Sequence, residues 1–169
     1  MKWIYIDERY LKQLREIEPR IPLSEYGKDK FVPFFGALFE KGELSYVTQV
    51  FAPKPRHHRI NNQKDFKKIY DQNNRLLCVV NLNYMFPIPT RLLEYVEYKN
   101  IDHYRLFNNE LDKSNYIKLL EKELAIINTM DLSSDAINLY HLRYEKPNDS
   151  VSKRCFDFKY LEEFAKSIQ

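Results

Sequence analysis

The order of the sequence patterns predicts an α+β fold in a single domain. Short apolar and β-branched runs precede Asp102, whereas apolar side chains at helical spacing follow it. Strands that come first and helices that come later are typical of helices packed on an antiparallel sheet. The chain has 169 residues, which is enough for one buried core and too few for two. We therefore expect one domain over residues 1–169, with an antiparallel sheet and a mostly helical C-terminal half.

The chain is expected to begin with a strand followed by a helix. Residues 3–6 form a short apolar and β-branched run, and Asp7 is a residue type that caps helix N-termini. The helix that follows carries apolar side chains three residues apart: Leu11, Leu14 and Ile17. Proline, serine, glycine and mixed charges in residues 21–30 then indicate a loop that carries Tyr26 and Lys30.

A hairpin and a central strand are expected next. Residues 34–39 and 44–51 are apolar runs on either side of a polar turn that contains glycine, and the second run leads directly into a basic segment. Residues 65–70 are compatible with a short strand or a turn. The continuous apolar run at 76–82 is typical of a central strand.

Proline and then helical patterns mark the rest of the chain. Pro87 and Pro89 predict an extended bend. Residues 92–98 fit a strand or a helix by periodicity, and we favour the strand. Three helical faces are predicted after that: Tyr116, Leu120, Leu124 and Ile127; Ile137, Tyr140 and Tyr144; Phe158, Leu161 and Phe164.

Composition excludes several classes of protein. The chain has only three glycines and no glycine-rich phosphate loop, which argues against ATP- and NAD-dependent chemistry. Cys78 and Cys155 are too few for a disulfide framework and lack the spacing of a zinc site, so both are expected to be reduced. No run approaches the roughly 18 apolar residues of a membrane span, and no signal peptide is evident. A cytoplasmic protein with no membrane association is expected.

The most informative stretch is the basic segment at residues 51–62, which contains two prolines and two histidines. From Lys54 to Lys68 there are six Lys or Arg and one acid, Asp65, although the chain as a whole has 27 basic and 24 acidic residues. A local cluster of positive charge is typical of a surface that binds a polyanion. The alternative is a solvated surface loop, and the residue pattern alone does not separate the two.

The residue types in this segment fit RNA cleavage without a metal. The ribose 2′-hydroxyl supplies the nucleophile, so the protein must accept its proton, stabilise charge on phosphorus and help protonate the leaving oxygen. His57 and His58 are candidates for proton transfer, and Lys54, Arg56 and Lys30 for charge stabilisation. The adjacent histidines lack metal-ligand spacing and a carboxylate cluster, so no metal and no other cofactor is expected.

At these residues the chain resembles the ToxN/AbiQ toxins, the protein halves of type III toxin–antitoxin systems. Ala-Pro-Lys-Pro-Arg-His at residues 52–57 is similar to the family's Ser-Pro-Lys-rich segment. Val-Asn-Leu-Asn-Tyr-Met-Phe-Pro-Ile at 80–88 is similar to its apolar-Asn-x-x-x-Met-x-Pro signature. The helix around Tyr10 precedes these motifs, and Lys-Arg-Cys-x-Asp-Phe at 153–158 follows them in the family's order.

The resemblance implies a function and partners. It implies a strongly twisted antiparallel sheet with surrounding helices, and a metal-independent, sequence-specific endoribonuclease that leaves a 2′,3′-cyclic phosphate. The antitoxin is expected to be a tandem-repeat RNA, which the toxin cuts into pseudoknots that inhibit it in a closed toxin–RNA hetero-oligomer. Cellular or phage RNA is the expected substrate, and growth arrest, as abortive defence against phage, the expected role.

The resemblance also implies catalytic residues. By spacing, the family's tyrosine and lysine match Tyr26 and Lys30, and a second lysine matches Lys54. The family's active-site serine falls on Ala52, which can neither donate nor relay a proton. Because the 2′-hydroxyl is the nucleophile, this loss need not abolish cleavage. Either His57, or a hydroxyl such as Thr48 or Tyr26, replaces the serine, or the protein is an inactivated or weakened form.

Further residues are candidates for binding RNA: Arg56, His58, Arg59 and Lys64 for the backbone, and Tyr10, Asn81, Asn83 and Tyr84 for bases. Each asparagine has the alternative role of anchoring a turn, and each tyrosine that of filling the core. Two other functions are compatible with these residues. One is a non-catalytic RNA-binding protein, and the other is a protein-interaction domain that uses exposed aromatic side chains.

Overall fold

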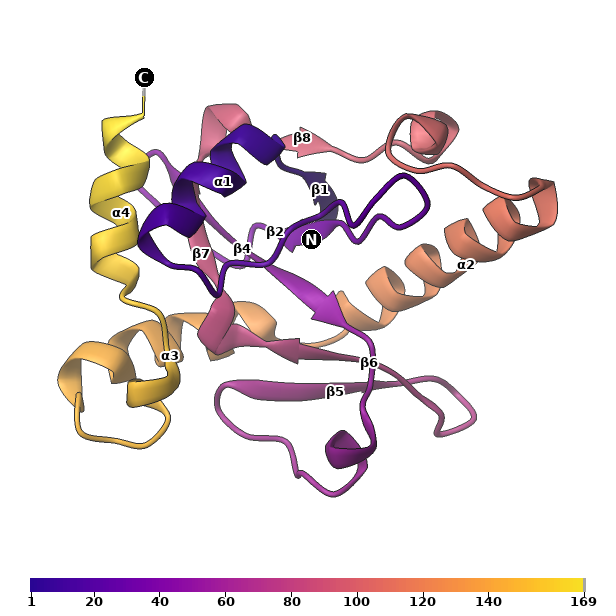
Figure 1. Cartoon of the computed structure of the whole chain (residues 1–169). Coiled ribbons are helices and arrows are strands. Elements are labelled where there is room, and N and C mark those ends of the chain that lie inside the picture. Colours follow the sequence, from indigo (N-terminus) through magenta and orange to yellow (C-terminus); the bar gives the residue numbers. More distant parts are fainter. Residues whose placement is uncertain (169) are drawn as a thin grey trace.

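A computed structural model describes residues 1–168 and confirms the α+β class (Figure 1). The strands are β1 (Lys2–Tyr5), β2 (Phe34–Gly36), β3 (Glu40–Lys41), β4 (Leu44–Phe51), β5 (Phe66–Tyr70), β6 (Leu76–Asn81), β7 (Phe86–Pro89) and β8 (Glu94–Tyr95). The helices are α1 (Glu8–Ile17), α2 (Glu110–Ile127), α3 (Leu132–Glu145) and α4 (Phe158–Ser167). No helix within residues 1–168 is long and apolar enough to cross a membrane.

The sheet is antiparallel and centred on β4. Its order is β5-β6-β4-β2-β1-β8, and β3 and β7 also pair with β4. The C-terminal end of β4 pairs with β2 on one side and β6 on the other, through Phe34 with Gln49 and Val50 with Val80. Its N-terminal end pairs instead with β3 and β7. The basic segment therefore leaves the sheet from its central strand.

Several predicted elements are confirmed. Asp7 accepts a hydrogen bond from the Arg9 amide and caps α1. The hairpin around residues 40–43 forms between β3 and β4, and residues 66–70 are a strand paired with β6. Leu120 and Ile127 bury the predicted face of α2, and Phe158 and Leu161 that of α4.

Three predicted elements are wrong in part. The strand expected at 34–39 ends at Gly36, because residues 37–39 bend away before β3 begins. Residues 86–89 form strand β7 instead of a bend; proline is tolerated there because, among the described strands, β7 pairs only with β4 and needs donors on one side only. The strand expected at 92–98 shrinks to Glu94–Tyr95, since 3₁₀ turns occupy both flanks.

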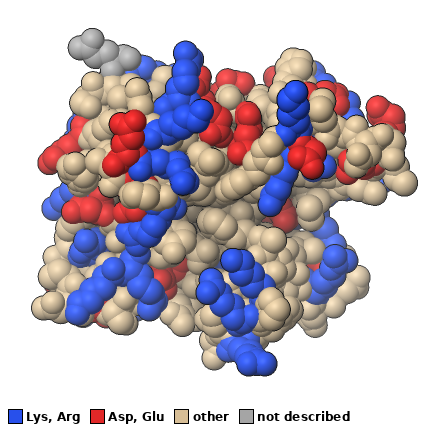
Figure 2. Space-filling model, viewed as in Figure 1, with Lys and Arg blue, Asp and Glu red and all other residues tan. Residues whose placement is uncertain are grey.

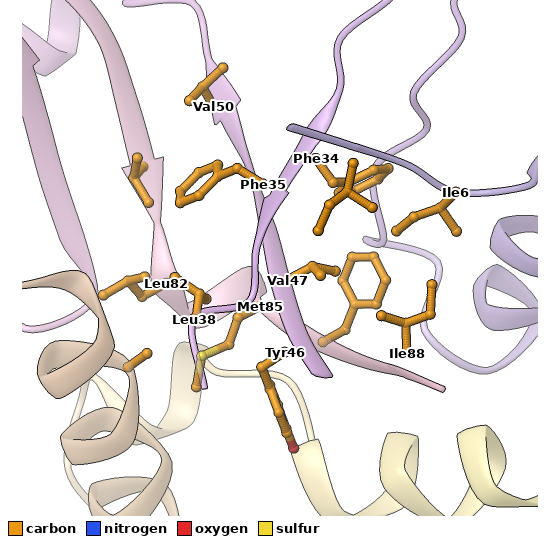
Figure 3. Packing of buried hydrophobic residues seen from close by; sticks show 14 of the residues in the cluster. Ile6, Phe34, Phe35, Leu38, Tyr46, Val47, Val50, Leu82, Met85 and Ile88 are labelled. Carbon is orange, nitrogen blue, oxygen red and sulfur yellow. The ribbon is translucent and has the colours of Figure 1, made fainter. Parts of the chain in front are cut away.

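The core lies where the sheet meets the helices. Figure 3 shows Phe34, Phe35 and Val47 packed with side chains from neighbouring strands, and Tyr46 directed towards the helical layer. The indole of Trp3 donates to the Leu120 carbonyl at 3.0 Å, which fastens β1 to α2.

The predicted face of α3 needs a correction. Ile137 is exposed, and the helix buries Leu132, Ala136 and Leu139 together with Tyr140. The three predicted positions are therefore not one buried stripe. Both cysteines, Cys78 and Cys155, are free and buried.

Glu162 of α4 forms a polar cluster at the edge of this core. Its carboxylate accepts hydrogen bonds from the Tyr46 hydroxyl at 2.7 Å and from the Lys41 ammonium at 2.7 and 2.9 Å, and Lys41 also contacts Tyr140. Burial by itself raises the pKa of Glu162, but the hydrogen bonds outweigh it and hold this pKa below its usual value. The cluster joins the β3–β4 hairpin to the C-terminal helices.

Candidate functional site

Tyr26 and Lys30 lie on a short, closed loop before β2. The Tyr26 amide donates to the Lys30 carbonyl at 2.9 Å, and the Val32 amide donates to the Ser24 carbonyl at 2.8 Å. The Lys30 ammonium lies 5.1 Å from the centre of the Tyr26 ring, within the range of a cation–π contact. The structure thus brings together the tyrosine and lysine to which the resemblance pointed.

The buried side chain of Gln49 fastens this loop to the sheet. Its amide group donates to the carbonyls of Leu23 (3.0 Å) and Val32 (2.6 Å), one on each side of the loop. On the far side, the Tyr116 hydroxyl of α2 donates to the Phe31 carbonyl at 2.6 Å. The loop that carries Lys30 is therefore positioned by side chains from both layers of the fold.

Gln49→Met is expected to loosen this loop. Methionine has a similar size but cannot donate, so two half-buried carbonyls lose their partner, at a cost of about 2 kcal/mol in unfolding free energy. Chemical denaturation and hydrogen exchange of residues 24–32 measure both effects. Gln13→Met, on the exposed side of α1, is the control. Unchanged exchange in this loop would show that Gln49 does not hold it.

A pocket of about 270 Å³ opens between this loop, β4, β6 and α2. The residues that bear on chemistry and line it are Tyr26, Lys30, Ala52, Cys78, Tyr116 and Glu123. Ala52, at the position where the resemblance implies a serine, thus faces the same space as Tyr26 and Lys30. Lys54 follows two residues later and is exposed.

The basic segment begins as a 3₁₀ turn, Pro55–His58, at the end of β4. Lys54, Arg56, His58, Arg59 and Lys64 all expose their side chains. Figure 2 shows a group of Lys and Arg side chains on the lower part of the molecule, where the connection between β4 and β5 lies in Figure 1. This surface is suited to contact with a polyanion.

His57 differs from its neighbours because it is buried. Its Nδ1 accepts a hydrogen bond from the Lys54 amide at 3.0 Å, and its ring centre lies 5.5 Å from that of Phe66. Burial lowers the pKa of His57, and the charges of Arg56 and Lys54 lower it further. The Arg56 Nε lies 3.4 Å from the His57 Nε2, so both ring nitrogens already have a partner within the turn. The geometry fits a residue that orders the turn.

Asp65, the one acid between Lys54 and Lys68, is a buried anchor. Its carboxylate accepts two hydrogen bonds from the Arg154 guanidinium, both at 3.0 Å, and its carbonyl accepts from the Leu82 amide at 2.8 Å. The basic segment is thereby fastened to the end of β6 and to the turn before α4. The sequence shows that Asp65 is the one acid in this basic stretch, but it does not show that Arg154 is its partner.

The other predicted RNA-binding residues are placed unevenly. Tyr84 is half-buried and stacks on Phe156, with ring centres 5.2 Å apart. Asn83 is buried and donates to the Arg154 carbonyl at 3.3 Å, whereas Asn81 is half-buried. Tyr10 is only 6% exposed and its hydroxyl donates to the Pro87 carbonyl, so the structure does not bring it to the pocket.

Thr48 does not replace the missing serine in this geometry. It is buried, and its hydroxyl donates to the Asn81 carbonyl at 3.3 Å. Tyr26, by contrast, is 44% exposed and lines the pocket. Of the two hydroxyl groups considered from the sequence, only that of Tyr26 belongs to a residue at the site.

Sequence reasoning missed Glu123. It lies on α2, is 5% exposed and lines the pocket. Burial raises its pKa to about 7, against the opposing effect of a hydrogen bond from Cys78. The signal was present, since Glu123 falls three residues after Leu120 and four before Ile127, on the inward face of the predicted helix.

The described residues, 1–168, contain no group of three or more His, Cys, Asp or Glu side chains arranged to hold a metal ion. The groups that face the pocket are one ammonium, one carboxyl, one thiol and two phenols. This set can stabilise a negatively charged ligand and exchange protons with it.

Comparisons with known proteins point to one family. A family model described as "Toxin ToxN, type III toxin-antitoxin system" matches residues 2–166. No match was found among curated proteins.

Three solved structures share the fold. One, from work described as "A processed non-coding RNA regulates a bacterial antiviral system", has a TM-score of 0.80 at 21% identity and covers 99% of each chain. A second, described as "selective toxin inhibition by a non-coding RNA pseudoknot", has a TM-score of 0.77 at 19% identity and covers 98% of this chain and 95% of that one. The third is AbiQ, "a lactococcal anti-phage endoribonuclease", with a TM-score of 0.75 at 16% identity and the same coverage.

Proposed function

Because this chain belongs to the ToxN toxin family of type III toxin–antitoxin systems, we propose that it is a metal-independent endoribonuclease. The observation that carries the proposal is the pocket that joins Tyr26, Lys30 and Ala52 beside the exposed basic segment. A phosphodiester held by that segment lies next to a cavity with an ammonium group and a proton-exchanging carboxyl. AbiQ, which shares the fold at low identity, is described as an anti-phage endoribonuclease.

The proposed reaction uses the RNA's own nucleophile. The 2′-hydroxyl attacks the adjacent phosphorus, the bond to the 5′-oxygen breaks, and a 2′,3′-cyclic phosphate remains. Lys54 and Lys30 stabilise the negative charge that develops on the phosphoryl oxygens. Arg56, His58, Arg59 and Lys64 bind neighbouring phosphates, and Tyr84 and Asn81 contact bases. His57 positions Lys54 through the hydrogen bond to its amide.

The proposed inhibitor is an RNA. The work on one structural neighbour is described as "selective toxin inhibition by a non-coding RNA pseudoknot". The basic surface of this chain suits such a partner. We propose a tandem-repeat RNA antitoxin that this enzyme cuts into pseudoknots, which then cover its pocket in a closed assembly. The free enzyme cleaves cellular or phage RNA and arrests growth.

Cleavage in the presence of a chelator tests the proposed activity. Purified protein incubated with total RNA and EDTA is expected to produce discrete fragments, and the same reaction with excess antitoxin repeat RNA is expected to produce none. Intact RNA in both reactions, together with salt-dependent RNA binding, would instead support the second candidate function. That candidate is a non-catalytic RNA-binding protein, and Ala52 at the family's serine position is the observation that favours it.

Ala52→Ser discriminates between a weakened enzyme and a protein that does not cleave. Ala52 is exposed and lines the pocket, so a hydroxyl fits there without displacing the core. A new donor at a developing phosphoryl charge is expected to raise the cleavage rate about tenfold or more. Single-turnover kinetics on a short RNA measure this rate. Ala125→Ser, on α2 away from the pocket lining, is the control, and equal rates for all three proteins would show that position 52 contributes no proton donor.

A further inference from the structure

Glu123 is a buried carboxyl whose position the fold alone does not explain. It is 5% exposed, and within residues 1–168 it forms no salt bridge. A buried acid with no cationic partner at an inward position of α2 costs stability that an apolar residue at the same place would not cost. The other buried acids behave differently, because Asp65, Asp71 and Glu162 each pair with a cation.

Apart from the hydrogen bond from the Cys78 thiol, the surroundings of Glu123 leave its carboxyl available to a ligand. Strand β6 contributes the Cys78 thiol, α2 contributes the Tyr116 phenol, and the loop before β2 contributes Tyr26 and Lys30. These are the titratable groups that line the pocket with it, and Lys30 is the single cation among them. Burial raises the pKa of Glu123 to about 7. A carboxyl with a pKa near the working pH is well suited to transfer protons.

We propose that the Glu123 carboxylate accepts the proton from the attacking 2′-hydroxyl, a role that rests on the proposed ribonuclease function. The bond from O2′ to phosphorus forms and the bond from phosphorus to O5′ breaks. The O2′ proton passes to Glu123, and the Lys30 ammonium donates a proton to the departing O5′. Solvent then removes the proton from Glu123 and returns one to Lys30. Glu123 thereby supplies the proton acceptor that His57 and Ala52 do not.

The pH dependence of this role has a definite sign. The carboxylate must be ionised, so the cleavage rate is expected to rise with pH through about 7 and then level off. Stability moves in the opposite direction. Because the folded-state pKa of Glu123 lies above its ordinary value, the folded protein holds a proton that the unfolded chain releases, and stability falls as pH rises from 4.5 through about 7.

Glu123→Gln is the test, because it preserves shape and cannot titrate. The cleavage rate is expected to fall 10²- to 10⁴-fold and to lose the rising limb near pH 7. In thermal unfolding, the variant is expected to lose the fall in stability between pH 4.5 and about 7, and to unfold at or above the wild-type temperature at pH 8. Glu121→Gln, two residues away and exposed on the same helix, is expected to match the wild type.

The outcomes separate this inference from the function on which it rests. If Glu123→Gln is poorly folded, Glu123→Asp keeps the carboxylate and is expected to retain the rising limb at a reduced rate. If the wild type cleaves RNA and Glu123→Gln cleaves at the same rate with the same pH profile, the role of Glu123 is overturned and the ribonuclease stands. If the wild type and Ala52→Ser cleave nothing, both are overturned.

Discussion

Lys54→Ala is expected to lower the rate of RNA cleavage 10²- to 10³-fold, because it removes a positive charge from the developing phosphorane. The fold is expected to stay intact. Lys54 is exposed, and its backbone makes the hydrogen bonds to His57 that order the 3₁₀ turn. Single-turnover cleavage of a short RNA measures the rate, and thermal unfolding verifies the fold.

Binding separates the proposed role from simple electrostatic attraction. Lys146→Ala removes an exposed lysine at the end of α3, far along the chain, and is the matched control. If Lys54 only attracted RNA, its loss would weaken binding and leave the rate at saturating protein unchanged. We expect the reverse, a large loss of rate at saturation with a small loss of affinity. Equal cleavage rates for Lys54→Ala and Lys146→Ala would show that Lys54 takes no part in the reaction.

Glu162→Ala is expected to have the largest effect on stability, about 3 kcal/mol of unfolding free energy. It deprives the fully buried Tyr46 hydroxyl of its acceptor and leaves Lys41 without a counter-ion. The pKa of Glu162 is held low, so its contribution is present above pH 4.5 and is lost as pH falls through the folded-state pKa. Denaturation of wild type and variant at pH 7 and pH 3 measures both effects.

Glu163 provides the control for this prediction. It is the next residue on α4 and is exposed, so Glu163→Ala is expected to change stability by less than about 0.5 kcal/mol. A loss of similar size in both variants would indicate that helix α4, and not the cluster of Glu162 with Tyr46 and Lys41, determines the effect. A difference that does not shrink at pH 3 would contradict the ionic character of the cluster.

The sequence predicted those parts of the fold that depend on local patterns. Asp7 at the start of α1 and the polar turn before β4 are local signals, and both elements form as expected. β7 was not predicted because a strand tolerates its two prolines only when it pairs on one side, as β7 does with β4. That pairing is a feature of the tertiary structure. The outward position of Ile137 likewise depends on how α3 packs, and helical spacing does not determine it.

The candidate site shows the same division. The sequence pointed to the pair of Tyr26 and Lys30 only through the resemblance, whereas the contact of Lys30 with the Tyr26 ring and the exposure of Lys54 come from the structure. Burial of His57 could not be predicted, because it depends on contact with Phe66 from the next strand. Glu123 was overlooked because an acid in a helix is normally assigned to the solvated face, and only the packing of α2 on the sheet turns it towards the pocket.

The chemical nature of the cut ends tests the proposed reaction most directly. RNA fragments from a reaction in EDTA are analysed by mass spectrometry and by their response to acid and to a 3′-phosphatase. We predict 2′,3′-cyclic phosphates on the upstream fragments and free 5′-hydroxyls on the downstream ones. Fragments with 5′-phosphates and free 3′-hydroxyls would contradict attack by the 2′-hydroxyl, and with it the roles proposed for Lys54, Lys30 and Glu123.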